Sequence, residues 1–415
     1  MVARVMVTFQ VVREPLIGPF AFKAHEINEL WQVIVGLPDG AGGIDWGLGA
    51  QSPVWGDPMV VDLAGIDGAN MMMAAITGHA ARVAADLPED LDPVEVQARL
   101  MPEVLLLARE MTNESIAESF VMNALVPIDQ AMWQRWARRH EIRDFADLIP
   151  PSVRPYLPVD PANAPPAAEI PLVSPTTGAE EIGELLARGL PLLKIRIGAD
   201  PNRDKDPSAM LDFDANRVIE VAAMVDRAEQ AGATGVRLYL DANGRYPDKA
   251  TLLTLLDRID DAGALHRIAL VEEPLPVAND EHLGDLPVPI GADESAFDTA
   301  SVERRAATGY SVIAVKPSAK TLTRSFAMIE AAGRAGMNCL VADLTAPPLL
   351  VAWNREVASR LTPLPGLERA TFESNGPQNY LHWADLSARL PQQQPGEPAP
   401  NLIDLAGHYL PGYGE

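Results

Sequence analysis

The sequence has 415 residues, and 47% of them are hydrophobic, which is enough for a large core and for more than one domain. Acidic side chains outnumber basic ones by 57 to 33, and the formal net charge of −24 argues against a nucleic acid or an anionic membrane as a partner. The single cysteine, Cys339, excludes an intrachain disulfide, so nothing in the composition points to secretion.

The N-terminal residues 1–15 predict a first β-strand rather than a signal peptide. Their apolar run is short, and no small-residue cleavage site precedes Arg13 and Glu14. No apolar run in the sequence approaches the ~20 residues of a membrane span. We therefore expect a cytoplasmic protein without a membrane partner.

A proline-rich stretch at residues 157–171 separates an irregular N-terminal part from a regular C-terminal part. In the C-terminal part, short apolar runs alternate with helical patterns, and the eight candidate strands lie at residues 170–175, 192–198, 235–241, 267–274, 288–295, 311–317, 338–344 and 369–374. Repeated βα units favour a parallel sheet, and eight of them favour a closed (β/α)₈ barrel of the α/β class. An open doubly wound sheet is the alternative, but no glycine-rich phosphate loop follows the first strand.

Three acidic residues end consecutive predicted strands. Asp241, Glu272 and Asp293 are separated by 31 residues (272 minus 241) and 21 residues (293 minus 272), about one βα unit each. In a barrel these strand ends converge on one mouth, where three carboxylates would repel one another unless a cation lay between them. Oxygen ligands suit Mg²⁺, or else Mn²⁺. Taken singly, an Asp after a strand is more often a helix cap or a turn residue.

Basic residues lie on two of the predicted strands. Lys194 and Arg196 are two residues apart and therefore point to the same face of the second strand, while Lys316 ends the sixth. An unpaired ammonium in a buried strand is costly, so we expect these lysines to serve the site. Asp343 ends the seventh strand, where it either acts as an acid or orients Lys316, or simply caps the next helix.

Taken together, these residues resemble the enolase superfamily, in its mandelate racemase and muconate-lactonizing branch. Lys194 and Arg196 align with that family's K-x-K pattern. The other matches are Asp241 in "DAN", Glu272 in "EEP", Asp293 in "ADES", Lys316, and the stretches at residues 124–133 and 373–377.

The resemblance implies a modified TIM barrel, of (β/α)₈ type, at residues 165–390 beneath an N-terminal α+β capping domain at residues 1–155. It also implies that a tail at residues 391–415 returns to the cap. Residues 13–20 and 47–55 are candidate specificity loops, although their Gly, Pro and Ser content would form turns in any case. The segment 200–214 is either a loop that contacts substrate or an acidic surface insertion.

The chemistry implied by the resemblance is removal of the proton α to a carboxylate. A divalent ion on Asp241, Glu272 and Asp293 would stabilise the enolate that forms. We expect lysines near the mouth to have pKa values lowered by burial, by the metal and by each other. The reaction expected from this pattern is that of a dehydratase or a cycloisomerase acting on a small organic acid such as a sugar acid.

Arg196 departs from the family pattern, because the second Lys of K-x-K is the usual base. An arginine is a poor base but a good clamp for carboxylate oxygens. Our hypothesis is that Arg196 orients or neutralises the substrate and Lys316 removes the proton, while Lys194 modulates the site or acts as a displaced partner. A single base suits elimination of water or cycloisomerisation. The family's other base, a His-Asp dyad, is excluded because no histidine lies between His282 and His382.

Two alternatives remain open. One is a two-base racemase or epimerase that acts on an acyl-amino acid or a dipeptide, with Arg196 or Lys194 making the second proton transfer. The other is a non-catalytic barrel that binds metal and anions. In each case the expected partner is a small-molecule carboxylate, and the resemblance also implies a homo-oligomer.

Overall fold

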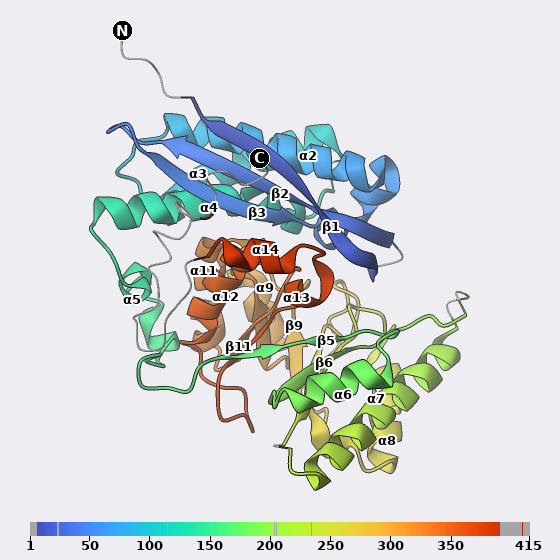
Figure 1. Cartoon of the computed structure of the whole chain (residues 1–415). Coiled ribbons are helices and arrows are strands. Elements are labelled where there is room, and N and C mark those ends of the chain that lie inside the picture. Colours follow the sequence, from blue (N-terminus) through green and yellow to red (C-terminus); the bar gives the residue numbers. More distant parts are fainter. Residues whose placement is uncertain are drawn as a thin grey trace.

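The computed structural model describes residues 6–22, 25–113, 115–202, 204, 206–233, 235–390 and 409. Figure 1 shows a barrel-like sheet surrounded by helices, with the N-terminal strands and helices stacked over one of its ends. The predicted fold class, a (β/α)₈-type barrel with an α+β cap, is confirmed. Within the predicted tail, residues 391–415, only Tyr409 is described, and it is buried.

The cap begins with a three-stranded antiparallel sheet in the order β1-β2-β3. Its strands are β1 (Thr8–Phe22), β2 (His25–Pro38) and β3 (Ile44–Gln51). The expectation of a loop at residues 13–20 is wrong, because this segment is part of β1. Its pairing with β2 shifts register between Pro15 and Phe20, so the glycine and prolines mark an irregularity inside a strand rather than a connection.

Helices follow the cap sheet, and several begin at sequence-encoded caps. Asp57 accepts the N–H of Met59, and Asp92 and Glu95 form a capping box. The helices of this part are α1 (Pro53–Gly56), α2 (Pro58–Asp86), α3 (Pro93–Met111), α4 (Glu118–Arg139) and α5 (Phe145–Leu148), followed by the 3₁₀ turn η1 (Arg154–Tyr156).

Helix α2 differs from the expectation that no segment is apolar enough to span a membrane. It has 29 residues and an 18-residue window of mean hydropathy 1.4, which meets the length and composition of a span. The helix has a break at Gly65, where the backbone leaves helical geometry, and its inner face packs against α4 and β2. A core helix of a soluble protein passes the same test, so the finding is weak evidence for a membrane segment.

The glycines of β3 allow α4 to approach the cap sheet closely. A Cβ atom on Gly47 would lie 1.8 Å from the backbone oxygen of Pro127, and one on Gly49 would lie 2.7 Å from that proline's ring. The first half of the predicted loop at residues 47–55 is therefore a strand whose glycines serve packing.

We expect Gly47→Ala to destabilise the protein by about 2 kcal/mol or more, because the backbone of α4 must move to admit a methyl group. Chemical unfolding monitored by circular dichroism would measure the loss. Gly18→Ala is the matched control, since a methyl group at Gly18 would have no other atom within 4 Å. Equal unfolding midpoints for the two variants would contradict this account of the packing.

The barrel sheet has nine strands, and all its pairs are parallel. Its order is β4-β12-β11-β10-β9-β8-β7-β6-β5. The strands are β4 (Ala168–Ile170), β5 (Leu172–Val173), β6 (Leu192–Arg196), β7 (Arg237–Asp241), β8 (Ile268–Glu272), β9 (Ile290–Ala292), β10 (Val312–Val315), β11 (Asn338–Val341) and β12 (Thr371–Glu373).

The first predicted strand occurs as two short pieces on either side of Pro171. The first piece, β4, pairs with β12, and the second, β5, pairs with β6. Proline has no N–H to donate to a ladder, which accounts for the interruption. Because the two pieces join the two ends of the strand order, this segment closes the barrel.

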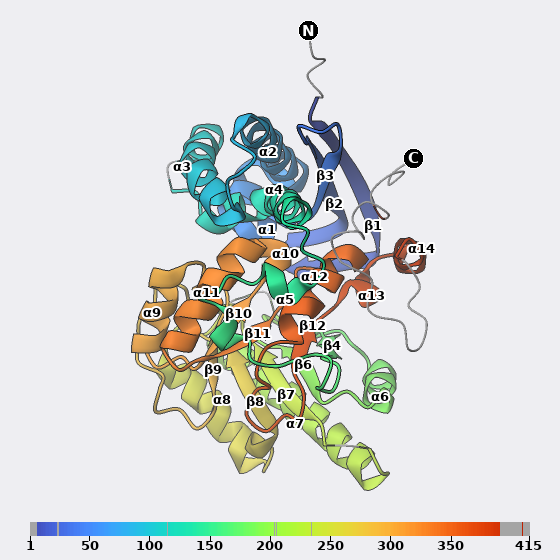
Figure 2. The same cartoon turned by 90° about the vertical axis from the view of Figure 1, so that its left-hand side faces the viewer.

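Long helices cover the outside of the barrel. They are α6 (Ala179–Ala187), α7 (Pro207–Gln230), α8 (Lys249–Asp261), α9 (Thr299–Ala307), α11 (Leu322–Arg334) and α12 (Pro348–Ala358), with the 3₁₀ turn η2 (Leu265–Arg267) before β8. Three short helices, α10 (Pro317–Lys320), α13 (Gly376–Asn379) and α14 (Trp383–Ala388), lie at the end of the barrel that meets the cap. Figure 2 shows α10 below α4 of the cap, which it contacts.

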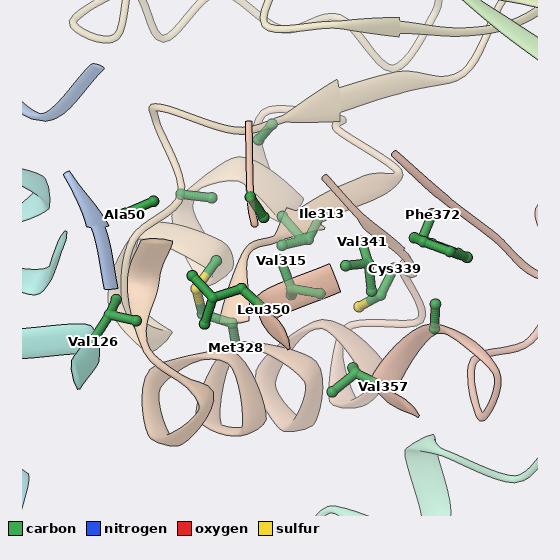
Figure 3. Close-up of a cluster of buried hydrophobic side chains, with 14 of the residues drawn as sticks. Ala50, Val126, Ile313, Val315, Met328, Cys339, Val341, Leu350, Val357 and Phe372 are labelled. Atoms are coloured by element: carbon green, nitrogen blue, oxygen red, sulfur yellow. The ribbon is translucent and has the colours of Figure 1, made fainter. Parts of the chain in front are cut away.

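The core has two layers. Inside the barrel, residues from several strands meet, among them Ile170, Leu192, Tyr239 and Leu340. Outside it, the strands pack on the helices, and Figure 3 shows side chains of β10, β11 and β12 against α11 and α12. Both faces of each strand are thus buried, and polar groups gather at the strand ends.

Candidate active site

The carboxyl ends of the barrel strands face the cap, and a pocket lies between the two. Cap residues from β1, β2 and the β3–α1 segment line one side of the pocket. The predicted site residues that line the other side are Lys194, Arg196, Asp241, Asp293, Lys316 and Asp343. The seventh predicted residue, Glu272, is buried and contacts Lys194.

Lys194 lies among three carboxylates. Its Nζ is 2.9 Å from Asp241 Oδ2, 2.7 Å from Glu272 Oε2 and 3.1 Å from Glu373 Oε2. Strands β6, β7 and β8 pair in register here, since Arg196 is opposite Asp241 and Asp241 is opposite Glu272. Burial favours the neutral amine, but the three carboxylates outweigh it and raise the pKa of Lys194 well above its usual range.

A second cluster surrounds Asp293. Lys316 Nζ donates to Asp293 Oδ2 at 2.5 Å, and Lys320 Nζ donates to Oδ1 at 3.0 Å. Lys320 also donates to the backbone oxygens of Asp293, Ala296 and Ala314. Burial would raise the pKa of Asp293, but the two ammonium groups overcome that effect and hold it well below its usual range.

The carboxylates around Lys194 and Lys316 raise the pKa of both lysines, against the lowering that we expect from burial and a bound metal. Burial does act to lower the pKa of Lys316, but Asp293 raises it by more, so the ammonium form is stabilised. Lys320 is the exception, because burial lowers its pKa despite its contact with Asp293. The two lysines that line the pocket are thus held in their charged form by carboxylates.

The three acids on β7, β8 and β9 have the donor chemistry of a Mg²⁺ site. Glu272 Oε1 is buried and has no hydrogen-bond partner among the described residues, which leaves one oxygen ready for a cation. Among the described residues, however, no three side chains of Asp, Glu, His or Cys lie close enough together to bind one metal ion. Lys194 bridges Asp241 and Glu272, and Asp293 is held by Lys316 and Lys320. The residues therefore fit Mg²⁺ in type, and binding requires that Lys194 withdraw.

Asp343 is held by the backbone of its own loop. Its Oδ1 accepts the N–H of Leu344 and of Ala346, and its Oδ2 accepts the N–H of Asn375. Burial, and then the charge of Glu373, raise the pKa of Asp343 to about 7. No hydrogen bond between Asp343 and Lys316 occurs in the described structure. Asp343 does not cap the next helix either, since α12 begins after Pro347 without a side-chain cap, and Asp343 instead fixes its own turn and the backbone at Asn375.

Arg196 reaches from the barrel to the cap. Its guanidinium carbon lies 5.4 Å from the ring centre of Phe20 and 5.1 Å from that of Phe22. Arg196 also contributes to the lowered pKa of Asp241. A planar guanidinium can stack on aromatic rings in a way that a lysine ammonium cannot, which gives a physical reason for arginine at this position.

The barrel sequence from residue 178 to residue 390 matches the model of a family described as enolase C-terminal domain-like. The chain belongs to the enolase superfamily, in its mandelate racemase and muconate-lactonizing branch. No curated protein matches the sequence.

Solved structures show the same fold as this enolase-superfamily chain. The L-Ala-D/L-Glu epimerase from Bacillus subtilis is 18% identical, with a TM-score of 0.60 over 91% of each chain. A dipeptide epimerase from Cytophaga hutchinsonii, complexed with Mg and the dipeptide D-Ala-L-Val, is 17% identical, with a TM-score of 0.62 over 90% of this chain and 87% of that one. The N-succinyl Arg/Lys racemase from Bacillus cereus is 14% identical, with a TM-score of 0.59 over 90% of this chain and 88% of that one.

Sequence reasoning missed two members of the site. Glu373 ends β12 and contacts Lys194, and the rule that strand ends converge would have found it. Lys320 lies four residues after Lys316, in a segment that reads as an ordinary turn. Its burial against backbone oxygens leaves no signal in the sequence.

The segment 200–214 is only partly a loop, since α7 begins at Pro207. Asp214 is buried and accepts the N–H groups of Gly198 and Ala199 as well as the Tyr246 hydroxyl. It therefore fixes the turn after β6. None of the described residues of this segment lines the pocket.

A buried carboxylate connects the cap to the barrel beside the site. Asp129 of α4 accepts the N–H groups of Leu322 and Thr323 at the start of α11, and Trp133 donates to Thr323 Oγ1 at 3.0 Å. These residues follow Lys316 and Lys320 closely in the chain. The predicted cap motif at residues 124–133 thus docks on the segment that carries the site lysines.

Burial raises the pKa of Asp129 to about 6, although the N–H groups of α11 oppose the shift. Because this folded-state pKa exceeds the ordinary value of 3.8, ionisation of Asp129 costs stability as the pH rises from about 4 through 6. We expect Asp129→Asn to match the wild type at low pH and to exceed it by on the order of 2 kcal/mol at pH 8. Thermal unfolding at a series of pH values would measure this, and a constant difference would contradict it.

Proposed function

We propose that this protein is a racemase or epimerase that removes the proton α to the carboxylate of an acyl-amino acid or a dipeptide. The observation that carries the proposal is that Lys194 and Lys316 line one pocket from strands β6 and β10. The acids of β7, β8 and β9 lie between these strands in the sheet order. Transfer of a proton from one face of the α-carbon to the other needs two acid-base groups, and lysines can serve.

Two further observations support the proposal. Solved structures with this fold include proteins described as dipeptide epimerases and as an N-succinyl Arg/Lys racemase. Three basic side chains, Lys194, Arg196 and Lys316, also line the pocket beside four acidic ones, and they are available as partners for a substrate carboxylate when a divalent ion neutralises the acids.

In this proposal Asp241, Glu272 and Asp293 hold Mg²⁺, or alternatively Mn²⁺. The ion would supply stabilisation of the negative charge that develops on the substrate carboxylate. Lys316 accepts the α-proton on one side once its Nζ has left Asp293 and has given up its own proton to become a neutral amine. Lys194 returns a proton on the other side, and Glu373 positions it.

A second candidate is the dehydratase or cycloisomerase reaction. It is favoured by Arg196, which occupies the position of the usual base on β6 and cannot readily accept a proton at neutral pH. In that case Lys316 acts alone, and Arg196 orients the substrate carboxylate. The two candidates share the first step and differ in the fate of the enolate.

The test starts from single enantiomers of N-acetyl-amino acids and dipeptides, incubated with the protein and Mg²⁺ in D₂O. Chiral chromatography with mass detection should show the opposite configuration at the α-carbon together with one added deuterium. An unsaturated or cyclised product would instead support the second candidate. Recovery of every acid unchanged would contradict the proposed racemase or epimerase.

A further inference from the structure

We infer that the substrate carries an apolar group, aryl or branched aliphatic, on the side of the carboxylate that faces the cap. The inference rests on the proposed function only in taking the substrate to be a carboxylate anchored at the barrel mouth. The class of substrate is inferred from the side of the pocket that the cap provides.

The two walls of the pocket differ in polarity. Every charged residue that lines it, among those described, comes from the barrel. The cap side carries no charged side chain among its described residues and consists of Leu16, Phe20, Phe22, Ile27, Leu30, Trp55 and the single polar residue Ser52. A bound acid therefore meets ionic partners on one side and hydrocarbon on the other.

The apolar wall is built into the fold. Phe20 and Phe22 are two residues apart on β1, so both point to the same face, and their rings stack with centroids 6.5 Å apart. Arg196 lies against both rings, which ties this end of β1 to the barrel. Ile27 and Leu30 of β2 line the same pocket and belong to the buried hydrophobic core, so the wall is continuous with the cap core.

Trp55 completes the wall beside the proposed base. Its ring lies 5.0 Å from Lys316 Nζ, and its indole Nε1 is buried without a hydrogen-bond partner among the described residues. A polyhydroxylated acid would leave most of its hydroxyl groups unpaired against such a surface, which is costly. The arrangement therefore selects an apolar acid rather than a sugar acid.

The experiment compares two probes that share a malonate group and differ only in the substituent. Benzylmalonate carries a phenyl ring and hydroxymalonate a hydroxyl, and each is titrated calorimetrically into the full-length protein with Mg²⁺. We expect benzylmalonate to bind at least about tenfold more tightly. Equal affinities, tighter binding of hydroxymalonate, or no binding of benzylmalonate would overturn the inference.

Variants of β1 test whether Phe20 is responsible for the preference for benzylmalonate. Phe20→Ser should weaken benzylmalonate by about tenfold and leave hydroxymalonate within about twofold, because only the apolar contact is lost. Ile17→Ser is the matched control, since Ile17 is on the same strand, is 62% exposed and does not line the pocket. Phe20→Leu, which keeps an apolar wall, should retain the preference and excludes a folding defect. An equal loss for both probes in Phe20→Ser would contradict the assignment.

The outcome also separates this inference from the proposed function. If the protein prefers benzylmalonate but catalyses no exchange of a substrate α-proton, the apolar wall is supported and the proposed reaction is contradicted. Proton exchange confined to hydrophilic acids would keep the reaction and overturn the substrate class.

Discussion

Lys316→Ala is expected to lower the rate of α-proton exchange by about 10³-fold or more, because it removes the group that accepts the proton. Lys316 follows β10, lines the pocket and donates to Asp293 at 2.5 Å, whereas Lys320, which also donates to Asp293, does not line the pocket. Deuterium uptake at the α-carbon of an accepted substrate, followed by NMR, measures the loss. Circular dichroism would establish that the variant is folded.

Lys249→Ala is the control for this prediction. Lys249 pairs with Asp285 and does not line the pocket, and its removal should leave exchange unchanged. Exchange by Lys316→Ala at the wild-type rate would show that another group is the base. The assignment of β10 to proton abstraction would then be wrong.

Lys194→Met is expected to tighten Mg²⁺ binding by about tenfold or more, because an ammonium and a divalent cation compete for the same oxygens. Lys194 Nζ bridges Asp241 Oδ2 and Glu272 Oε2 at 2.9 and 2.7 Å, two of the three proposed ligands. Titration calorimetry with Mg²⁺ would measure the change. The same variant should lose racemisation, since Lys194 is the proposed second proton-transfer group.

The stability of Lys194→Met provides an independent readout. Without Mg²⁺ the variant leaves buried carboxylates uncompensated, which is strongly destabilising. Added Mg²⁺ should therefore raise its unfolding temperature more than that of the wild type. Weaker Mg²⁺ binding by the variant would mean that the ammonium supports the metal site rather than competing with it.

The barrel could be predicted because its signals are local. Each strand is a short apolar run, each acid follows a strand, and the separations of Asp241, Glu272 and Asp293 match one βα unit. Period-two alternation also placed Lys194 and Arg196 in the same pocket. The rule of converging strand ends then brought together residues that lie far apart in the sequence.

The predictions that differ from the structure concern features that are set by contacts between residues far apart in the sequence. Residues 13–20 contain glycine and prolines, yet pairing with β2 makes them part of a strand. The sign of the lysine pKa shifts depends on the distances between each amine and the carboxylates around it, such as Asp241, Glu272 and Glu373 around Lys194, and these distances are set by the packing of separate strands. The stacking of Arg196 on Phe20 and Phe22 likewise joins two parts of the chain that no local pattern connects.

Above all, we propose that this site removes an α-proton with the help of a divalent ion. The most direct measurement is deuterium incorporation at the α-carbon of a pool of N-acetyl-phenylalanine, N-acetyl-leucine and apolar dipeptides, with Mg²⁺ in one sample and EDTA in the other. We predict loss of the α-proton signal with Mg²⁺ and its retention with EDTA. Retention in both samples, or equal loss in both, would contradict the proposal.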